Sequence, residues 1–218
     1  MRVAVIGATG FVGSEIVKEL INRNHSIKAF SRNKDKVIVS KNVAAVEVDV
    51  NNIEALVADL RGADVVVSAY NAGWSNPDLY NDYIKGSNAI EQATKQAGVK
   101  RLIVVGGAGS LYVNDQKELQ LVDAPGFPDE IKPGATAARD YYNTLQNNQN
   151  LDWTYFSPAP EMHQGTSGVR KGTYRLGTDV PVFDETGHSI LSVEDVAVVI
   201  ADEVENAKHV KQRFTAAY

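Results

Sequence analysis

A glycine-rich turn close to the N-terminus constrains the fold of this chain more than any other feature. It reads Gly7-Ala8-Thr9-Gly10-Phe11-Val12-Gly13 and lies between an apolar strand pattern at residues 3–6 and a helical pattern at residues 11–22. In such a unit the first glycine permits a tight turn, the second lets the backbone approach a diphosphate, and the third lets the helix pack closely on the sheet. The backbone amides that open the helix then hold negative charge. The pattern predicts a bound dinucleotide, with Gly7, Thr9, Gly10, Phe11, Val12 and Gly13 as cofactor-binding residues.

The remainder of the chain favours this interpretation over the alternative, a glycine turn that merely joins a strand to a helix. Short apolar runs alternate with helical patterns, which is typical of stacked βαβ units. We therefore predict an α/β fold, a three-layer Rossmann fold with a mostly parallel central sheet. A single domain is expected over residues 1–218, with a small C-terminal substrate-side extension at about 157–192. Further strands are expected at residues 27–30, 44–48, 65–67, 102–105, 152–156 and 213–217, and further helices at 53–60, 79–97, 134–147 and 193–205.

Composition argues against several classes of partner. The formal net charge is −5, so the chain lacks the basic surplus that nucleic-acid binding requires. There is no cysteine, and the four histidines do not pair at a metal-ligand spacing, so neither a disulfide nor a metal site is expected. No apolar run approaches the length of a membrane span, and the N-terminus has no signal-peptide pattern. We expect a cytoplasmic protein without a nucleic-acid or membrane partner.

The end of the second predicted strand indicates which dinucleotide is bound. NAD-binding proteins usually place a carboxylate there to hold the ribose hydroxyls. This chain instead has Ser31-Arg32-Asn33-Lys34, and a guanidinium can hold a 2′-phosphate through two hydrogen bonds. Ser31 and Arg32 therefore predict that NADPH is bound in preference to NADH. The alternative is that Arg32 and Lys34 are solvated charges opposite Asp35.

Several segments resemble those of the atypical short-chain dehydrogenase/reductases. The glycine spacing of residues 7–13, the Ser31-Arg32-Asn33 ending and the turn Ser157-Pro158-Ala159 match that family's pattern. More narrowly, the chain is similar to bacterial NADH-flavin reductase-like proteins, which are relatives of biliverdin reductase B and of the NmrA-like proteins. This likeness is carried by residues 104–110, 151–158, 174–177 and 192–197, which read VVGGAGS, LDWTYFSP, YRLG and SVEDVA.

The chain departs from the family at its best-known catalytic pair. That pair is a tyrosine with a lysine four positions later on a helix, where the lysine lowers the tyrosine pKa so that the phenol exchanges a proton with a carbonyl. None of the nine tyrosines has a lysine at that spacing. The absence fits reduction of a flavin or a quinone, because a flavin accepts hydride at N5 and its proton can come from water.

Ligands of parallel α/β sheets lie at the carboxyl ends of the strands, which selects the loops that follow them. Asp49 and Val50 follow the third predicted strand and are expected to reach the adenine, although a plain turn carboxylate accounts for Asp49 nearly as well. Contacts to the ribose and the nicotinamide are expected after the fourth, fifth and sixth strands, the last of these being implied by the resemblance. The residues concerned are Ser68, Ala69, Tyr70, Gly106, Gly107, Pro158 and Ala159.

Two residues are candidates for the chemistry itself. Ser110 stands where the resemblance places the family's active-site serine, and its hydroxyl could orient the acceptor; a loop-capping serine is an equal alternative. His163 could supply a proton near neutral pH, although a lone histidine in a loop is more often solvated. Trp74 and Tyr70 are candidates to cover a flat substrate, with simple packing as the alternative.

Together these residues favour an NADPH-dependent oxidoreductase that transfers hydride to a small planar acceptor such as FMN, FAD or a quinone. Two alternatives stay open. The chain could be a non-catalytic NADP(H)-sensing regulator whose partner is another protein, as the NmrA-like resemblance allows. Less favoured is an epimerase or dehydratase of small sugars, because the tyrosine–lysine pair is missing. Either a monomer or a homodimer is compatible with the sequence.

Overall fold

The chain forms one eight-stranded sheet in the computed structural model, which describes residues 1–218. The strands are β1 (Arg2–Ile6), β2 (Ser26–Ser31), β3 (Val43–Glu47), β4 (Val65–Ser68), β5 (Arg101–Val105), β6 (Asp152–Ser157), β7 (Arg175–Gly177) and β8 (Gln212–Ala217). Their order is β3-β2-β1-β4-β5-β6-β8-β7, and only the β7–β8 pair is antiparallel. The strand order reverses between β1 and β4, and such a switch point opens a ligand crevice at the carboxyl ends of the strands.

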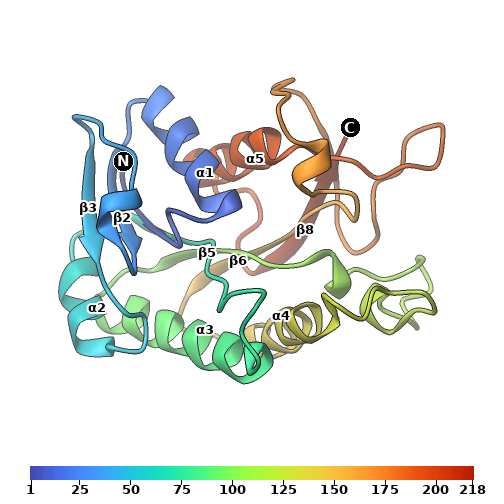
Figure 1. Cartoon of the computed structure of the whole chain (residues 1–218), viewed down its shortest axis with the longest axis horizontal. Coiled ribbons are helices and arrows are strands. Elements are labelled where there is room, and N and C mark those ends of the chain that lie inside the picture. The colour runs from blue at the N-terminus through green and yellow to red at the C-terminus, as the bar shows by residue number, and fades with distance from the viewer.

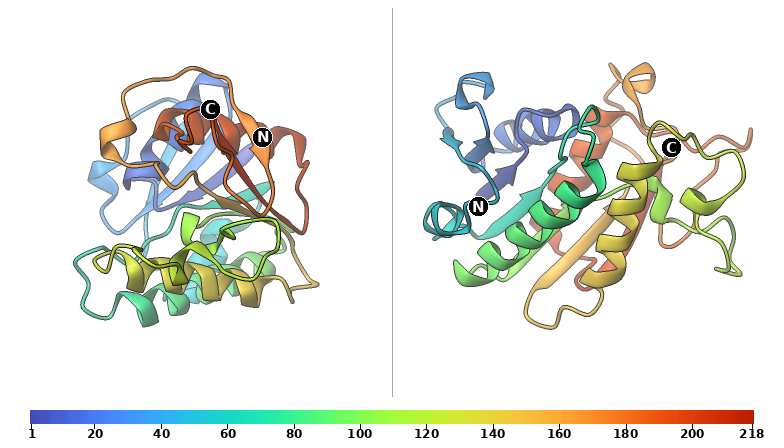
Figure 2. Two further views of the ribbon diagram at one scale, coloured as in Figure 1. Left: turned by 90° about the vertical axis from the view of Figure 1, so that its right-hand side faces the viewer. Right: turned by 60° about the horizontal axis from the view of Figure 1, so that its bottom comes forward.

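Five helices cover the two faces of this sheet. They are α1 (Phe11–Asn22), α2 (Ile53–Leu60), α3 (Leu79–Gln96), α4 (Lys132–Leu145) and α5 (Val193–Asn206). Helices α1 and α5 lie side by side on one face, and α2, α3 and α4 cover the other, so the predicted three-layer α/β architecture is confirmed (Figures 1 and 2). None of these helices combines the length and the hydropathy needed to cross a membrane.

Each face of the sheet buries its own apolar core. Strand β4 is buried along its whole length, as expected for a parallel strand covered on both sides. Beneath α1 and α5, the rings of Phe156 and Phe214 pack with centroids 5.1 Å apart. Beneath α2, α3 and α4, the core contains the fully buried rings of Tyr141 and Tyr155. The central strands are therefore held rigidly, and their carboxyl ends form a fixed edge on which a site can be built.

Local signals in the sequence explain where several elements begin and end. Asn52 caps α2, because its side-chain oxygen accepts a hydrogen bond from the Ala55 amide at 3.2 Å. Helix α3 stops just before Gly98, which takes the left-handed conformation at φ 77°. Helix α4 begins two residues earlier than expected, because Pro133 is accommodated in its first turn. Residues 157–192, the predicted substrate-side extension, contain a single complete short strand, β7.

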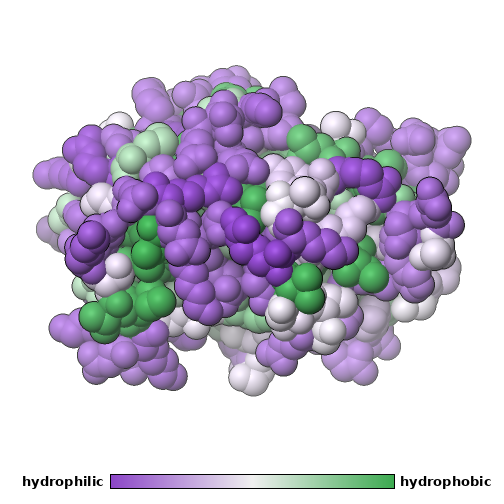
Figure 3. Space-filling model, turned by 90° about the horizontal axis from the view of Figure 1, so that it is seen from above, coloured by the Kyte–Doolittle hydropathy of each residue, from purple (hydrophilic) through white to green (hydrophobic).

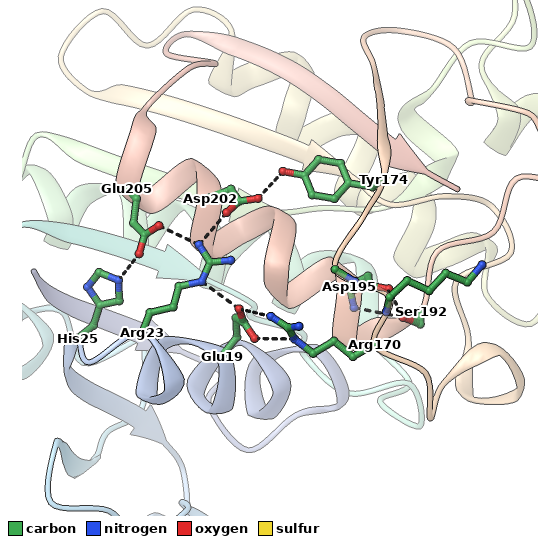
Figure 4. A network of polar contacts seen from close by, with 11 residues as sticks. Glu19, Arg23, His25, Arg170, Tyr174, Ser192, Asp195, Asp202 and Glu205 are labelled. Carbon is green, nitrogen blue, oxygen red and sulfur yellow. Dashed lines mark hydrogen bonds and ion pairs between the residues drawn. The ribbon is translucent and has the colours of Figure 1, made fainter.

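A polar network fastens the extension to the helices that cover one face. We call residues 167–174 the strap. Its Arg170 donates two hydrogen bonds to the Glu19 carboxylate of α1, at 2.9 and 3.0 Å. Arg23 of α1 contacts Glu19 and reaches across to Asp202 of α5 at 2.7 Å (Figure 4). The surface seen from above is largely hydrophilic, and its apolar patches are separate rather than continuous (Figure 3).

Replacing Glu19 with glutamine tests this network. Burial raises the pKa of Glu19, but the hydrogen bonds and charges of Arg170 and Arg23 outweigh burial and hold its pKa below the ordinary value. A lowered folded-state pKa stabilises the fold above the unfolded-state pKa, and this stabilisation disappears as the pH falls through the folded-state value. Glu19→Gln should therefore lower the free energy of unfolding by about 1–2 kcal/mol near neutral pH and by much less near pH 3, measured by urea unfolding. A deficit that is equal at both pH values would contradict the ionic role.

Candidate functional site

A cleft of about 440 Å³ opens at the carboxyl ends of β1, β2, β3 and β4. It lies where the strand order reverses, which is the position expected for a dinucleotide in a sheet of this kind. Many of the residues predicted to bind the cofactor line this cleft: Gly7, Thr9, Gly10, Ser31, Arg32, Asp49, Val50, Ala69 and Tyr70. Residues from four separate predicted loops are thus brought together around one cavity.

The glycine turn takes the conformation that its pattern predicts. Gly7 has φ 80°, and a Cβ atom built on it would lie 2.4 Å from the carbonyl oxygen of Ala69. A Cβ atom on Gly13 would lie only 2.1 Å from the carbonyl oxygen of Gly7. The first and third glycines are therefore needed to bring the loop after β4, the turn and α1 into close contact.

The first backbone amides of α1 are free of protein partners. The amides of Gly7 and Ala8 both donate to the carbonyl oxygen of Phe30 at 3.1 Å, which fixes the turn against β2. The next three helical amides, those of Phe11, Val12 and Gly13, donate to no protein group, and no side chain caps this helix. Unpaired donors at the positive end of a helix fit the diphosphate of a dinucleotide.

The part of the cleft that follows β2 carries an unpaired guanidinium. Arg32 lines the cleft and is exposed, and it forms no ion pair with Asp35 or any other carboxylate. Beside it, the Ser31 hydroxyl lies 2.9 Å from the Thr9 hydroxyl and accepts the Asn33 amide at 3.1 Å. These hydroxyls join the β2 loop to the glycine turn and leave Arg32 available for an anionic group.

Asp49 lies in the cleft wall and also serves as a turn carboxylate. It lines the cleft, and its carboxylate also accepts hydrogen bonds from the backbone and the side-chain amide of Asn51, at 2.9 and 3.0 Å. Its contact with adenine stays a prediction. The aromatic ring of Tyr70 lies against α3, where a Cβ atom on Gly86 would be 2.4 Å from its hydroxyl oxygen. Tyr70 thus forms a wall of the cleft: its ring fills the space left by Gly86, and its hydroxyl donates to the carbonyl oxygen of Asp82 at 3.1 Å.

Part of the cleft wall was missed from the sequence. Asn71, Ala72 and Asn76 from the loop after β4, and Asp82 from the first turn of α3, also line it. The Asn76 side chain donates to the Asp82 carboxylate at 2.8 Å, which holds this loop against the helix. The pattern of asparagine, glycine and proline indicated a loop here, and the carboxyl-end position of that loop was the signal that could have identified these residues.

The other residues predicted to contact the ribose and the nicotinamide lie at the ends of β4, β5 and β6, outside the lining of this cleft. Ser68 is the last residue of β4 and is buried. Gly106 follows β5, and a Cβ atom there would lie 2.0 Å from the phenol of Tyr155. Pro158 and Ala159 are buried directly after β6. With Gly107, these residues share the carboxyl edge with the cleft, and their contacts with a nicotinamide stay predictions.

The hydroxyl of Ser110 is turned into the protein. The side chain is fully buried, donates to the carbonyl oxygen of Gly107 at 2.9 Å and lies 2.8 Å from the Ser157 hydroxyl. The Ser110 carbonyl oxygen accepts further hydrogen bonds from Gln120, at 2.9 Å, and from Arg213. This geometry favours the loop-capping alternative, and a direct contact with the acceptor stays a prediction.

His163 and Trp74 are both on the surface. The His163 Nδ1 atom accepts the Gly165 amide at 3.0 Å and caps a short helical turn, so its role as a proton donor stays a prediction. Trp74 is 62% exposed, and one edge of its ring packs on Gly134 of α4, where a Cβ atom would lie 2.9 Å away. No group of three or more histidine, aspartate or glutamate side chains is arranged to hold a metal ion.

The tyrosines of α4 are unsuited to acid–base chemistry. The hydroxyl of Tyr141 donates to Glu91 at 3.2 Å, and burial together with that carboxylate raises the pKa of Tyr141 well above its ordinary value. Burial likewise raises the pKa of Tyr142, although Arg213 opposes the shift. Neither phenol is therefore prepared to lose its proton near neutral pH.

A glycine turn with free amides, at the switch point of a doubly wound sheet, defines a Rossmann-type dinucleotide-binding protein. A family model described as NAD(P)H-binding matches residues 7–207, and the chain belongs to this family. The resemblance to NADH-flavin reductase-like proteins is confirmed by a solved structure of that name, which matches the chain over its whole length.

Three solved structures that are similar to this chain carry different functional names. A proposed epimerase from Bacteroides thetaiotaomicron is 38% identical with a TM-score of 0.91, and the match covers 100% of this chain and 96% of that one. A proposed NADH-flavin reductase from Streptococcus pneumoniae is 34% identical with a TM-score of 0.88, covering 100% and 99%. A proposed exported protein from Burkholderia pseudomallei is 40% identical with a TM-score of 0.86, covering 100% of both chains. The shared fold is that of NAD(P)H-binding oxidoreductases and epimerase-like proteins.

Proposed function

We propose that this protein is an NADPH-dependent reductase of the atypical short-chain type, which transfers hydride to a flat acceptor such as a flavin or a quinone. The observation that supports the cofactor choice is the Arg32 guanidinium, which lines the dinucleotide cleft without an acidic partner. A bidentate contact between a guanidinium and a phosphate is geometrically specific, and only NADPH carries the 2′-phosphate.

The choice of acceptor rests on the residues available for catalysis. NADPH supplies a hydride when bound, so that NADPH, a proton and the oxidised acceptor give NADP⁺ and the reduced acceptor. The amides of Phe11, Val12 and Gly13 hold the diphosphate, and Arg32 holds the adenosine end. The loops after β5 and β6 then fix the nicotinamide at the carboxyl edge. Because no tyrosine–lysine pair is present, an acceptor that takes its proton from water fits this chain best.

Replacing Arg32 with alanine tests the cofactor assignment. The KM for NADPH should rise at least tenfold, because the counter-charge of the 2′-phosphate is lost, whereas the KM for NADH should change by less than about twofold. Lys36→Ala is the matched control, since Lys36 is an exposed cation on the same turn and outside the cleft. Equal effects of Arg32→Ala on the two dinucleotides would disprove the assignment.

A turnover assay decides between an enzyme and a regulator. NADPH oxidation should be observed spectroscopically when FMN, FAD or a quinone is added to the purified protein. Tight NADPH binding with no turnover on any of these acceptors would contradict the reductase and favour the NADP(H)-sensing regulator. Turnover of a sugar nucleotide without net NADPH consumption would instead favour an epimerase.

A further inference from the structure

A second cavity, of about 280 Å³, lies between the strap and the end of β8. Its walls include Val169, Lys171, His188, Ile190 and Tyr218, and it shares no lining residue with the dinucleotide cleft. We call it the strap pocket. Because β8 runs parallel to β6, Tyr218 stands at the same carboxyl edge of the sheet as the loop after β6. The strap pocket is therefore on the cofactor side of the molecule.

Lys171 presents an unpaired positive charge to this pocket. Its ammonium lies 3.5 Å from the centroid of the Tyr218 ring and within ion-pair distance of no carboxylate. One buried carboxylate, that of Asp195, fixes the surroundings. It accepts the backbone amides of Lys171 and Gly172 at 2.8 and 2.7 Å and also accepts the Tyr218 hydroxyl at 2.5 Å. The backbone of Lys171 and the ring beneath its ammonium are thus held in place before any ligand arrives.

The strap is itself held from both sides. Arg170, next to Lys171, is bound to Glu19 of α1, and Tyr174 donates to Asp202 of α5 at 2.5 Å (Figure 4). These anchors use the neighbouring polar side chains and leave the Lys171 ammonium free. Because the backbone around Lys171 is already ordered, little further conformational entropy is lost when an anion binds to its ammonium.

The other charged groups around the pocket are already engaged. Asp184 accepts hydrogen bonds from the Thr186 amide and hydroxyl and from the His188 amide, at 2.8, 2.7 and 3.0 Å. The His188 Nδ1 atom lies 3.0 Å from the Glu161 carboxylate, and its Nε2 atom has no protein partner. Asp184 keeps its negative charge, although these neutral donors stabilise it, and Lys171 is the lining cation that has no acidic partner. Val169, Ile190 and the Tyr218 ring add an apolar surface beside it.

The pocket adjoins the loop that is predicted to contact the nicotinamide. The Glu161 amide donates to the carbonyl oxygen of Ser189 at 3.0 Å, and the Ser189 amide donates to the Glu161 carboxylate at 2.9 Å. Ser189 lies between two lining residues of the pocket, and Glu161 is two residues beyond Ala159. Two extended residues span at most about 7 Å. The predicted nicotinamide loop and the pocket wall formed by His188 and Ile190 are therefore neighbours, and this pocket is the candidate site for an anionic side chain of a planar ring stacked at that loop.

We infer that the strap pocket binds the phosphate end of the acceptor, with Lys171 as its counter-charge. The inference rests on the proposed function, because it takes the planar part of the acceptor to lie on the nicotinamide. It narrows the acceptor to a phosphorylated flavin such as FMN, in preference to riboflavin or a neutral quinone.

Flavin binding to protein saturated with NADP⁺, followed by quenching of flavin fluorescence, tests this inference without requiring turnover. The wild-type protein should bind FMN about tenfold more tightly than riboflavin, because only FMN carries the phosphate. Lys171→Met should weaken FMN binding about tenfold and leave riboflavin binding unchanged. Lys171→Arg should keep the preference for FMN. Lys95→Met is the matched control, because Lys95 is an exposed cation near the end of α3, at the opposite edge of the sheet.

Three results would overturn the inference: equal affinity of the wild-type protein for FMN and riboflavin, an unchanged FMN preference in Lys171→Met, or no binding of either flavin. Failure of the proposed function is recognised separately, by the absence of NADPH oxidation with every acceptor tried. An FMN preference that depends on Lys171 would support the inference even in a protein that does not turn over.

Discussion

Gly13→Ala is expected to raise the Kd for NADPH about a hundredfold. The added Cβ atom would lie 2.1 Å from the carbonyl oxygen of Gly7, a distance that neither backbone can accommodate without moving. The turn and the start of α1 must then separate, which displaces the amides of Phe11 and Val12 from the diphosphate. Calorimetric titration of the folded variant with NADPH measures the change.

Gly98→Ala separates this effect from a general loss of stability. Gly98 has φ 77°, and a Cβ atom built on it would have no neighbour within 4 Å. An alanine there therefore strains the backbone by about 1 kcal/mol and leaves the cleft unchanged. Its melting temperature should fall while its Kd for NADPH stays at the wild-type value. If Gly13→Ala bound NADPH as tightly as Gly98→Ala, the close contact between helix and turn would not be what positions the amides.

Arg213→Met is expected to lower the free energy of unfolding by about 2–3 kcal/mol, because it removes a buried guanidinium that pairs with the partly exposed Asp179 carboxylate and hydrogen-bonds the carbonyl oxygen of Ser110. The Arg213 side chain is 1% exposed and contacts the Asp179 carboxylate and the carbonyl oxygen of Ser110. Its guanidinium also lies 4.8 Å from the ring centroid of Tyr142. Urea unfolding monitored by circular dichroism measures the loss.

Lys117→Met is the matched control, because Lys117 forms an ion pair with the same Asp179 at 2.7 Å while its own side chain is 51% exposed. An exposed pair contributes little, so this variant should be close to the wild type in stability. If Arg213→Met were no less stable than Lys117→Met, the buried arginine would not be what fastens the loop after β5 to β8.

The strands and the phosphate turn could be predicted because their signals are local. Val65, Val66 and Val67 form a continuous apolar run, and a strand covered on both faces requires such a run. The glycines at positions 7 and 13 are needed by contacts within a few residues of the turn and with the adjacent strand end. The edge strand β3 starts at Val43, one residue earlier than expected, because its partly exposed residues lack a sharp apolar boundary.

The remainder of the site depends on contacts between distant segments. Whether the Ser110 hydroxyl faces the cleft or the protein interior is decided by Ser157, which is 47 residues away in the sequence. The loop from Asn71 to Asn76 reaches the cleft because the Asn76 side chain bonds to Asp82 of α3. No local pattern contains this information, because asparagine and serine are also common in solvated turns that lie far from any site.

Calorimetric titration of the wild-type protein with NADPH and with NADH measures whether the cleft binds a dinucleotide and which one it prefers. We expect one dinucleotide per chain, with NADPH bound at least tenfold more tightly because Arg32 contacts its 2′-phosphate. If a folded sample bound neither dinucleotide, the cleft would not be a dinucleotide site, and tighter binding of NADH would rule out the role of Arg32.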